Sequence, residues 1–198
     1  IWNGGLGFYG GLIGGTLGVI LYCAIHKKNF LKLADIVVLG LVFGQGIGRW
    51  GNFVNQEAYG YYISDENLRW FPFGVYIEHC HQAGCECPGY GWHLATFFYE
   101  FMNNMIIFVI LTVLLYKVKF KSDGIIGACY LIMYGFCRFI VEGLRTDSLY
   151  LGPFRISQVL SIVFILCGVA YILYCYFRNK KKKSSYDIIM NVLKNDLK

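Results

Sequence analysis

Long apolar runs recur along the chain, separated by shorter polar segments. Five of these runs come close to or exceed the ~20 residues that a helix needs to cross a bilayer. They cover residues 6–25, 36–53, 95–116, 124–142 and 156–177. Most of them lack the polar face that a helix on a soluble core would carry. We therefore interpret the chain as an all-α polytopic membrane protein, a helical transmembrane bundle, and not as a soluble domain with a very apolar core.

Charged residues make up only 15% of the chain, and the basic ones are distributed unevenly between the polar segments. Thirteen Lys and Arg lie in loops 26–34 and 117–123 and in the tail 178–198, whereas three lie in the alternating loops 54–94 and 143–155. Because cytoplasmic loops are enriched in Lys and Arg, we predict a basic cytoplasmic tail and outward-facing alternating loops. The net charge of +6 lies mostly in this tail, where it favours contact with anionic membrane lipids and indicates no nucleic-acid partner.

The loop 54–94 is long, aromatic and rich in turn residues, and it predicts a small extracytoplasmic loop domain with strand character near residues 70–77. It contains three cysteines, Cys80, Cys85 and Cys87. Their spacing matches no standard zinc pattern. A disulfide with one thiol left over is favoured outside the cell, and a metal site is the weaker alternative.

Two arginines lie inside the apolar runs, Arg49 near the end of the second and Arg138 near the end of the fourth. A charge in the bilayer costs several kcal/mol and usually serves a substrate or an ion. In the predicted topology, the polar groups embedded in these runs fall in the outer half of the membrane. An arginine fork binds phosphate through two parallel hydrogen bonds, so we predict a site for a phospholipid headgroup in that layer.

The polar residues of the fourth run repeat at helical spacing. Tyr134, Arg138 and Glu142 follow one another at intervals of four and share one face of a helix. Arg138 and Glu142 can form an ion pair, and a purely structural pair that orients two helices is the alternative interpretation.

Glycines dominate the first run, where Gly10, Gly14 and Gly18 form one stripe and Gly11 and Gly15 a second. Two interpretations remain open. Such stripes are typical of close helix packing in membranes, and they also leave space for a lipid tail or headgroup.

Residues 48–60 resemble the signature of a known bacterial family, prolipoprotein diacylglyceryl transferase. That signature reads Gly-Arg-x-Gly-Asn-Phe-x-Asn-x-Glu-x-x-Gly, and the segment matches it at every fixed position. Three further blocks resemble the family's glycine-rich block, its His-to-Glu block and its late Arg-Phe block, in the expected order. They are residues 1–14, 93–100 and 134–145. The resemblance covers about residues 1–177 and leaves only the basic tail outside.

Two departures from the family pattern affect the expected chemistry. Tyr9 stands where the family commonly has a histidine that is proposed as the general base. A tyrosine has an ordinary pKa of about 10, so it is a poor base unless Arg49 or another cation lowers that pKa, although it could still hydrogen-bond the substrate. The block beginning at His93 lacks the family's proline and is one residue longer, which weakens His93 as a site residue. Family members also carry two spans before the glycine-rich block, and we expect the printed sequence, which opens at Ile1 without Met, to be truncated there.

The resemblance implies a transferase of the bacterial plasma membrane. It would move the diacylglyceryl group of phosphatidylglycerol to the thiol of the lipobox cysteine in a prolipoprotein signal peptide, forming a thioether and releasing glycerol phosphate. Arg49 and Arg138 would hold the phosphate and stabilise charge on the leaving group, and Tyr9 or a phosphate oxygen would take the thiol proton. The expected substrate-binding residues are Asn52, Asn55, Glu57, Tyr134, Glu142, Gly10, Gly11 and Gly60. Among them, Glu57 and Glu142 are expected to orient the arginines. No cofactor, metal or nucleotide motif is implied.

Two other functions fit a membrane bundle with embedded arginines. A carrier or channel for anions would need polar groups through the full depth of the bilayer, and the inner halves of these runs are nearly free of them. A lipid-binding scaffold without catalysis would lose partner binding when Arg49 is removed, with lipid transfer unaffected.

Overall fold

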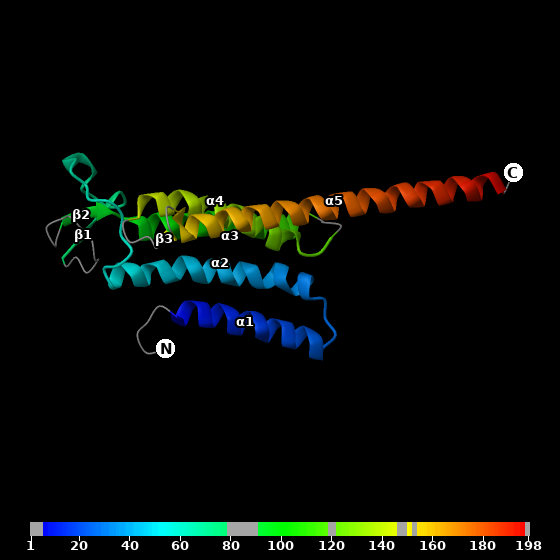
Figure 1. The fold of residues 1–198 in the computed structure, drawn as a ribbon, viewed down its shortest axis with the longest axis horizontal. Coiled ribbons are helices and arrows are strands. Elements are labelled where there is room, and N and C mark those ends of the chain that lie inside the picture. The colour runs from blue at the N-terminus through cyan, green and yellow to red at the C-terminus, as the bar shows by residue number, and fades with distance from the viewer. Residues whose placement is uncertain (1–5, 79–90, 119–121, 146–149, 152–153, 197–198) are drawn as a thin grey trace.

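The computed structural model describes residues 6–78, 91–118, 122–145, 150–151 and 154–196. Its main elements are five helices, each of which runs opposite to the one before it (Figure 1). They are α1 (Leu6–Ile25), α2 (Phe30–Val54), α3 (Thr96–Lys117), α4 (Ile125–Leu144) and α5 (Ile156–Asp196). Four of them are long and apolar enough to cross a membrane, namely α2, α3, α4 and the Ile156–Lys181 part of α5. In α1 the side chains are described without a gap only from Ile13, and Ile13–Ile25 is a shorter apolar stretch. The predicted all-α polytopic membrane fold is confirmed.

Helix α2 begins six residues before the predicted apolar run because Asn29 caps it. The Asn29 side chain accepts hydrogen bonds from the backbone N–H groups of Leu31 and Lys32, which satisfies donors that a helix start leaves open. Asp35 therefore lies inside α2, although the sequence placed it just outside the span. Its carboxylate accepts hydrogen bonds from the backbone N–H groups of Gly124, at 2.7 Å, and Gly127, at 2.9 Å. A negative charge at the N-terminus of α4 is favourable there, so Asp35 ties the start of α4 to α2.

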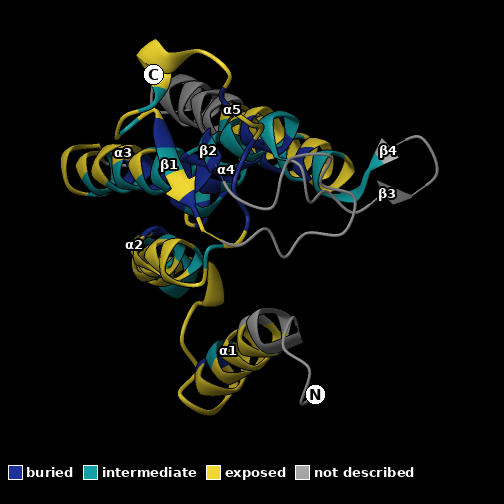
Figure 2. Cartoon of the chain, turned by 90° about the vertical axis from the view of Figure 1, so that its left-hand side faces the viewer, coloured by how far each residue is buried: buried dark blue, intermediate teal, exposed yellow. Residues whose placement is uncertain are grey.

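The core lies between α2, α3 and α4, where apolar side chains interlock. Its buried members are Val38, Val42, Ile107, Leu111, Ile126 and Tyr130. The outer faces of the helices are exposed and apolar, and α1 carries mostly exposed residues (Figure 2). This is the pattern of a bundle surrounded by lipid, whose tails take the place of a polar solvent.

Close helix packing occurs at isolated glycines and not at the glycine stripes of α1. A Cβ atom on Gly135 of α4 would lie 2.8 Å from the carbonyl oxygen of Ser161 on α5, and one on Gly168 of α5 would lie 2.7 Å from that of Ala128. At Gly10, Gly11, Gly14, Gly15 and Gly18, by contrast, an added Cβ would meet none of the described atoms within 4 Å. The expectation of close packing along these stripes is therefore not met among the described residues, because no neighbouring helix of this chain lies against them.

A small cap joins α2 to α3 at one end of the bundle (Figure 1). It contains a 3-10 turn (Glu66–Leu68) and the antiparallel pair β1 (Gly74–Ile77) and β2 (Gly91–Leu94), with Val75 opposite His93. The strand expected near residues 70–77 is thus present from Gly74, while residues 71–73 form a turn. A second short pair, β3 (Tyr150–Leu151) and β4 (Phe154–Arg155), precedes α5. Cys80, Cys85 and Cys87 lie outside the described residues.

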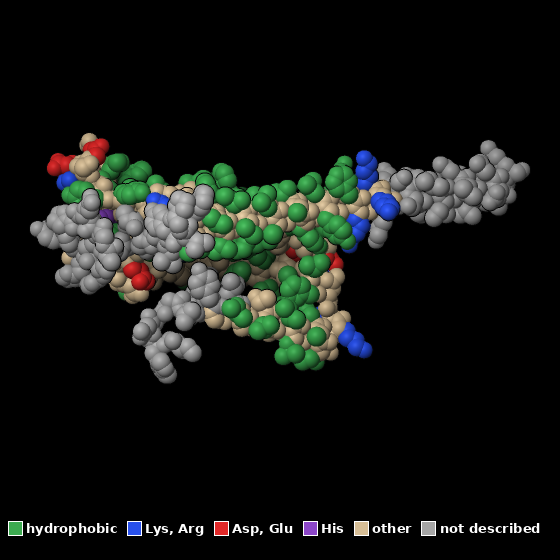
Figure 3. Space-filling view, viewed as in Figure 1, with side chains coloured by type: hydrophobic (Ala, Val, Ile, Leu, Met, Phe, Trp, Pro, Cys, Tyr) green, Lys and Arg blue, Asp and Glu red, His purple; other side chains and the backbone are tan. Residues whose placement is uncertain are grey.

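Basic side chains gather at the end of the bundle away from the cap (Figure 3). They belong to the α1–α2 connection, with Lys27 and Lys28, and to α5, with Arg178, Lys180 and Lys181. Helix α5 continues without a break through the predicted tail to Asp196. The division into a membrane core of residues 1–177 and a cytoplasmic tail, like the outward orientation of the cap, stays a prediction.

Candidate functional site

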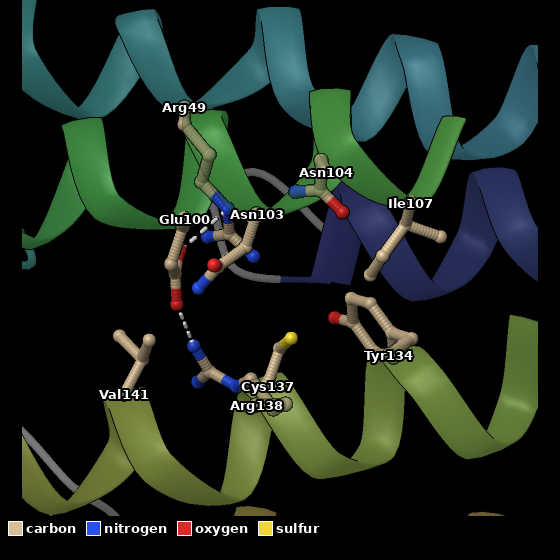
Figure 4. Close-up of a pocket in the computed structure, with 9 residues that line it drawn as sticks. All are labelled: Arg49, Glu100, Asn103, Asn104, Ile107, Tyr134, Cys137, Arg138 and Val141. Carbon is tan, nitrogen blue, oxygen red and sulfur yellow. Dashed lines mark hydrogen bonds and ion pairs between the residues drawn. The ribbon is translucent and has the colours of Figure 1, made fainter. Parts of the chain in front are cut away.

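One buried carboxylate connects three helix ends on the cap side of the bundle. Glu100, in the second turn of α3, has a side chain that is only 7% exposed. Its Oε2 lies 2.6 Å from Nε of Arg49 on α2, and its Oε1 pairs with Nη1 of Arg138 on α4 (Figure 4). Nη1 of Arg145, just after α4, lies 3.9 Å from the same Oε1. The two arginines predicted to form one site are therefore brought together, and Glu100 holds them.

The antiparallel order of the helices explains this meeting. Arg49 lies near the end of α2, Glu100 near the start of α3 and Arg138 in the second half of α4, so all three fall at the cap end. Gly46 allows the approach of α2 to α3, because a Cβ atom there would lie 3.3 Å from Cβ of Asn104 and would also clash with Met105. In lipid such close approach is usually made by small residues.

Arg138 is held from two sides. Its Nη2 lies 2.6 Å from Oε2 of Glu142, one helical turn further on, and the Glu142 side chain is 1% exposed. The predicted pair of Arg138 and Glu142 is present. The backbone carbonyl of Glu142 in turn accepts a hydrogen bond from Nη1 of Arg155. These contacts position Arg138 within a region of low dielectric, where its interactions with another charge are strong.

The arginines and Glu100 line a narrow cavity together with neutral polar side chains. Its walls are Arg49, Glu100, Asn103, Asn104, Ile107, Tyr134, Cys137, Arg138 and Val141. The enclosed space is about 10 Å³, which is room for about one water molecule. A guanidinium group carries five N–H donors, and in its contacts with described residues Arg49 uses only Nε. Its two terminal nitrogens therefore remain available to a ligand.

Several residues expected at the site lie apart from this cluster. Asn55 and Glu57 are exposed beyond the end of α2, where Nδ2 of Asn55 donates to Oε1 of Glu57 at 3.2 Å. Among the described residues Glu57 contacts no arginine, and Glu100 has the position expected of it. Asn52 is half-buried in the last turn of α2. Its backbone carbonyl accepts from the N–H of Glu57 at 2.9 Å.

Gly60 and His93 tie the cap to the bundle. A Cβ on Gly60 would lie 2.8 Å from Cβ of Leu94 and 2.9 Å from the carbonyl oxygen of Leu144. Nδ1 of the buried His93 lies 3.0 Å from the carbonyl oxygen of Gly60 and can donate a hydrogen bond to it. Gly60 also pairs with Arg145 in an isolated β-bridge. Both residues therefore have packing roles next to the site.

The glycine-rich segment of α1 faces a second, larger cavity. A space of about 630 Å³ lies between α1, α2, α4 and α5, with Gly11 and Gly15 among its mostly apolar lining residues. This agrees with the interpretation that the glycine stripes leave space, and Gly10, in the other stripe, is exposed. The backbone of Tyr9 belongs to α1, and its side chain lies outside what the structure describes.

Sequence reasoning did not assign three residues of the cluster: Glu100, Arg145 and Asn104. Glu100 and Arg145 are the last residues of two of the blocks that resemble the family, which is a signal that could have identified them. Asn104 carries no such signal, since only the packing of α3 shows which of its faces turns inward.

The chain is similar to known proteins over most of its length. A family model described as prolipoprotein diacylglyceryl transferase matches residues 1–174. The chain is 38% identical over 183 residues to phosphatidylglycerol–prolipoprotein diacylglyceryl transferase 1 of Clostridium perfringens, covering 92% of this chain and 67% of that protein. It is 37% identical over 186 residues to the transferase so named from Streptococcus agalactiae, covering 94% and 68%. A further such protein, from Clostridium novyi, is 42% identical over 180 residues, covering 91% and 66%.

Proposed function

The chain belongs to the prolipoprotein diacylglyceryl transferase family, and from this premise we propose how its polar cluster serves the reaction. The protein is a multi-pass membrane transferase that moves a diacylglyceryl group from phosphatidylglycerol to a prolipoprotein. We propose that the cluster around Glu100 binds the phosphate of the donor headgroup. The observation that carries this proposal is the meeting of Arg49 and Arg138, from two helices, on one buried carboxylate. Family membership does not favour an anion carrier or a lipid-binding scaffold.

The phosphate first accepts hydrogen bonds from the two terminal nitrogens of Arg49. These donors are unused in contacts with described residues, and a guanidinium fork matches two oxygens of a phosphate. The cavity of about 10 Å³ is too small for the headgroup, so binding requires Glu100 to release part of its contact with the arginines. The anionic phosphate then replaces the carboxylate as their partner, and neither arginine is left as an uncompensated buried charge.

The reaction then takes place at the carbon of the diacylglyceryl group that bears the phosphate ester. The sulfur of the acceptor cysteine, in the lipobox of the prolipoprotein, attacks this carbon and forms a C–S bond. The C–O bond to the phosphate breaks, and its electron pair leaves with glycerol phosphate. Arg49 and Arg138 stabilise the charge that develops on this leaving group, in a site where such contacts are strong. The thiol loses its proton to one of two candidate groups, the Tyr9 side chain in its phenolate form or a phosphate oxygen held by the arginines.

The donor lipid comes from the outer leaflet, because the cluster lies at the cap end and most Lys and Arg of the polar segments lie toward the other end (Figure 3). Cytoplasmic segments carry the excess of Lys and Arg. The cluster can therefore be reached sideways from the outer half of the plasma membrane.

The proposal is tested with purified full-length protein in detergent, phosphatidylglycerol and a lipobox peptide, by measuring released glycerol phosphate. Release should require the peptide cysteine. Arg49→Ala should lower turnover by on the order of 10²–10³, as loss of a charge-stabilising donor does in other enzymes. Arg138→Lys should also be costly, since a point charge cannot replace a two-pronged fork.

The matched control is Arg178→Lys on α5, at the opposite end of the bundle, which should leave turnover unchanged. Near-normal release from folded Arg49→Ala protein would overturn the assignment of the headgroup site.

A further inference from the structure

Asn104 is a buried polar residue that neither the ion-pair cluster nor the helix packing explains. It lies on α3 one turn after Glu100 and is 3% exposed. It belongs to the wall of the same narrow cavity as the arginines. Among the residues that the structure describes, its carboxamide has no hydrogen-bond partner. A buried polar group without a partner is destabilising, so this carboxamide is suited to a ligand that enters the cavity.

Tyr134, which is half-buried, presents a second polar group without a described partner from the opposite wall. It lies on α4 one turn before Arg138, and its ring stacks on Tyr130 with 5.4 Å between the centroids. Its hydroxyl, like the Asn104 carboxamide, makes no hydrogen bond within the described part of the chain. Figure 4 shows the two side chains reaching into the space between α3 and α4, next to the arginines and Glu100.

The position of Asn104 is set by tight packing. A Cβ added to Gly46 of α2 would lie 3.3 Å from Cβ of Asn104, so α3 packs closely against α2 at this position. A carboxamide held in this way is an oriented donor and not a solvated surface group.

Polarity falls in steps from the cap end toward the middle of the bundle. The charged layer of Arg49, Glu100 and Arg138 comes first. One turn further in, about 5–6 Å by helix geometry, come the unpartnered Asn104 and Tyr134. On α2 and α4, the Tyr130 hydroxyl donates to Oε1 of Gln45 at 2.9 Å, with Gln45 one turn from Arg49 and Tyr130 two turns from Arg138. The apolar core follows.

We propose that Asn104, together with Tyr134, binds the ester carbonyl oxygens of the diacylglyceryl group that is transferred. This inference rests on the proposed function, because it requires the phosphate to lie at the arginines. The ester carbonyls of a diacylglycerol phospholipid follow the phosphate by a few covalent bonds, and they accept hydrogen bonds but cannot donate them. The Asn104 NH₂ and the Tyr134 hydroxyl are donors at the matching depth. They therefore select a donor lipid whose chains are joined by ester bonds.

The test compares two donor lipids with the same headgroup and chains. One is ordinary phosphatidylglycerol with ester bonds, and the other is its analogue with two ether bonds, which lacks the carbonyl oxygens. Full-length enzyme should use the ether lipid with a kcat/KM roughly tenfold lower, the size of effect expected when a buried donor loses its acceptor. Asn104→Leu, which keeps the side-chain shape, should use both lipids with nearly equal kcat/KM. Tyr134→Phe should reduce the preference in part.

Thr112→Val is the matched control on the same helix. The Thr112 hydroxyl donates to the backbone carbonyl of Phe108, away from the cavity, so this variant should keep the roughly tenfold preference. The ratio of the two kcat/KM values does not depend on the fraction of folded enzyme. A purely structural role for Asn104 would lower both values equally and leave the ratio unchanged.

Three outcomes would overturn the inference: no ester preference in the unmodified enzyme, a wild-type preference in Asn104→Leu, or a preference lost equally in Thr112→Val. A failure of the proposed headgroup site is detected by a different measurement from a failure of the ester-binding proposal. In the first case Arg49→Ala retains turnover with ester lipid, whatever the ester-to-ether ratio is.

Discussion

At Glu100, a single carboxylate compensates guanidinium groups from two different helices. Glu100→Gln keeps the shape of the side chain and removes its charge, so the positive charges of Arg49 and Arg138 would lose the carboxylate between them. Both arginines are largely shielded from solvent, since their side chains are 22% and 17% exposed, respectively. Removing one partner of a buried ion pair typically costs about 3–5 kcal/mol. We expect a clearly lower midpoint of thermal unfolding in detergent. Glu66→Gln removes a carboxylate that is 88% exposed and should leave the midpoint unchanged.

An equal midpoint for Glu100→Gln and Glu66→Gln would show that Glu100 does not hold the arginines. If addition of phosphatidylglycerol raises the midpoint of Glu100→Gln more than that of the unmodified protein, the phosphate has replaced the missing carboxylate. That result is expected from the exchange of partners proposed above.

The residues that the sequence could predict at this scale are those related by helical spacing. Tyr134, Arg138 and Glu142 lie four apart, and the observed pair of Arg138 and Glu142 follows directly from that interval. No interval relates Arg49, Glu100 and Arg138, because they come from three helices. Glu57 is nearer to Arg49 in sequence than Glu100 is, but its described contact is with Asn55. Of the two carboxylates expected to orient the arginines, Glu142 therefore pairs with one, and Glu100 has the position expected of Glu57.

At the scale of elements, glycines separate into those that helices pack against and those that face open space. Gly135→Ala places a methyl group 2.8 Å from the Ser161 carbonyl oxygen and 3.0 Å from Cγ1 of Ile165. Overpacking of this kind costs about 1–3 kcal/mol, which exceeds the gain of up to about 1 kcal/mol in helix propensity. Gly18→Ala meets no described atom within 4 Å and keeps only the propensity gain. We expect a lower unfolding midpoint for Gly135→Ala and an unchanged or slightly higher one for Gly18→Ala.

A loss of stability in Gly18→Ala as large as that in Gly135→Ala would instead show that the α1 stripe packs closely against a partner. The contrast explains why the glycine pattern of α1 was a poor guide to packing. A stripe of small residues permits a close approach but does not supply a neighbour, whereas the single Gly135 and Gly168 lie where α5 crosses α4. The helix positions themselves were predictable, because length and hydropathy determine them. The start of α2 was not, since it depends on the Asn29 cap.

At the scale of the whole molecule, the charges of the two ends determine how the bundle lies in the membrane. The cap end carries the arginine cluster, and the other end carries the basic α1–α2 connection and the basic part of α5. Because Lys and Arg are retained on the cytoplasmic side, we expect the tail inside the cell and the cap outside. A green fluorescent protein fused after Lys198 should therefore fluoresce, and one fused after Leu68 in the cap should not. An alkaline phosphatase fused at the same two positions should give the opposite pattern, with activity only after Leu68.

This orientation decides which lipid the enzyme can reach. With the cap outside, the arginines lie in the half of the bilayer that faces an exported prolipoprotein, so the donor lipid and the acceptor thiol meet on the same side. Fluorescence from the Leu68 fusion, with none from the Lys198 fusion, would show that the bundle has the opposite orientation in the membrane. The arginine cluster would then open to the inner leaflet, and the acceptor would have to be modified before export. The reversed arrangement would require thirteen of the Lys and Arg residues to lie outside and only three in the cytoplasmic loops, so we expect the fusions to support the outward-facing site.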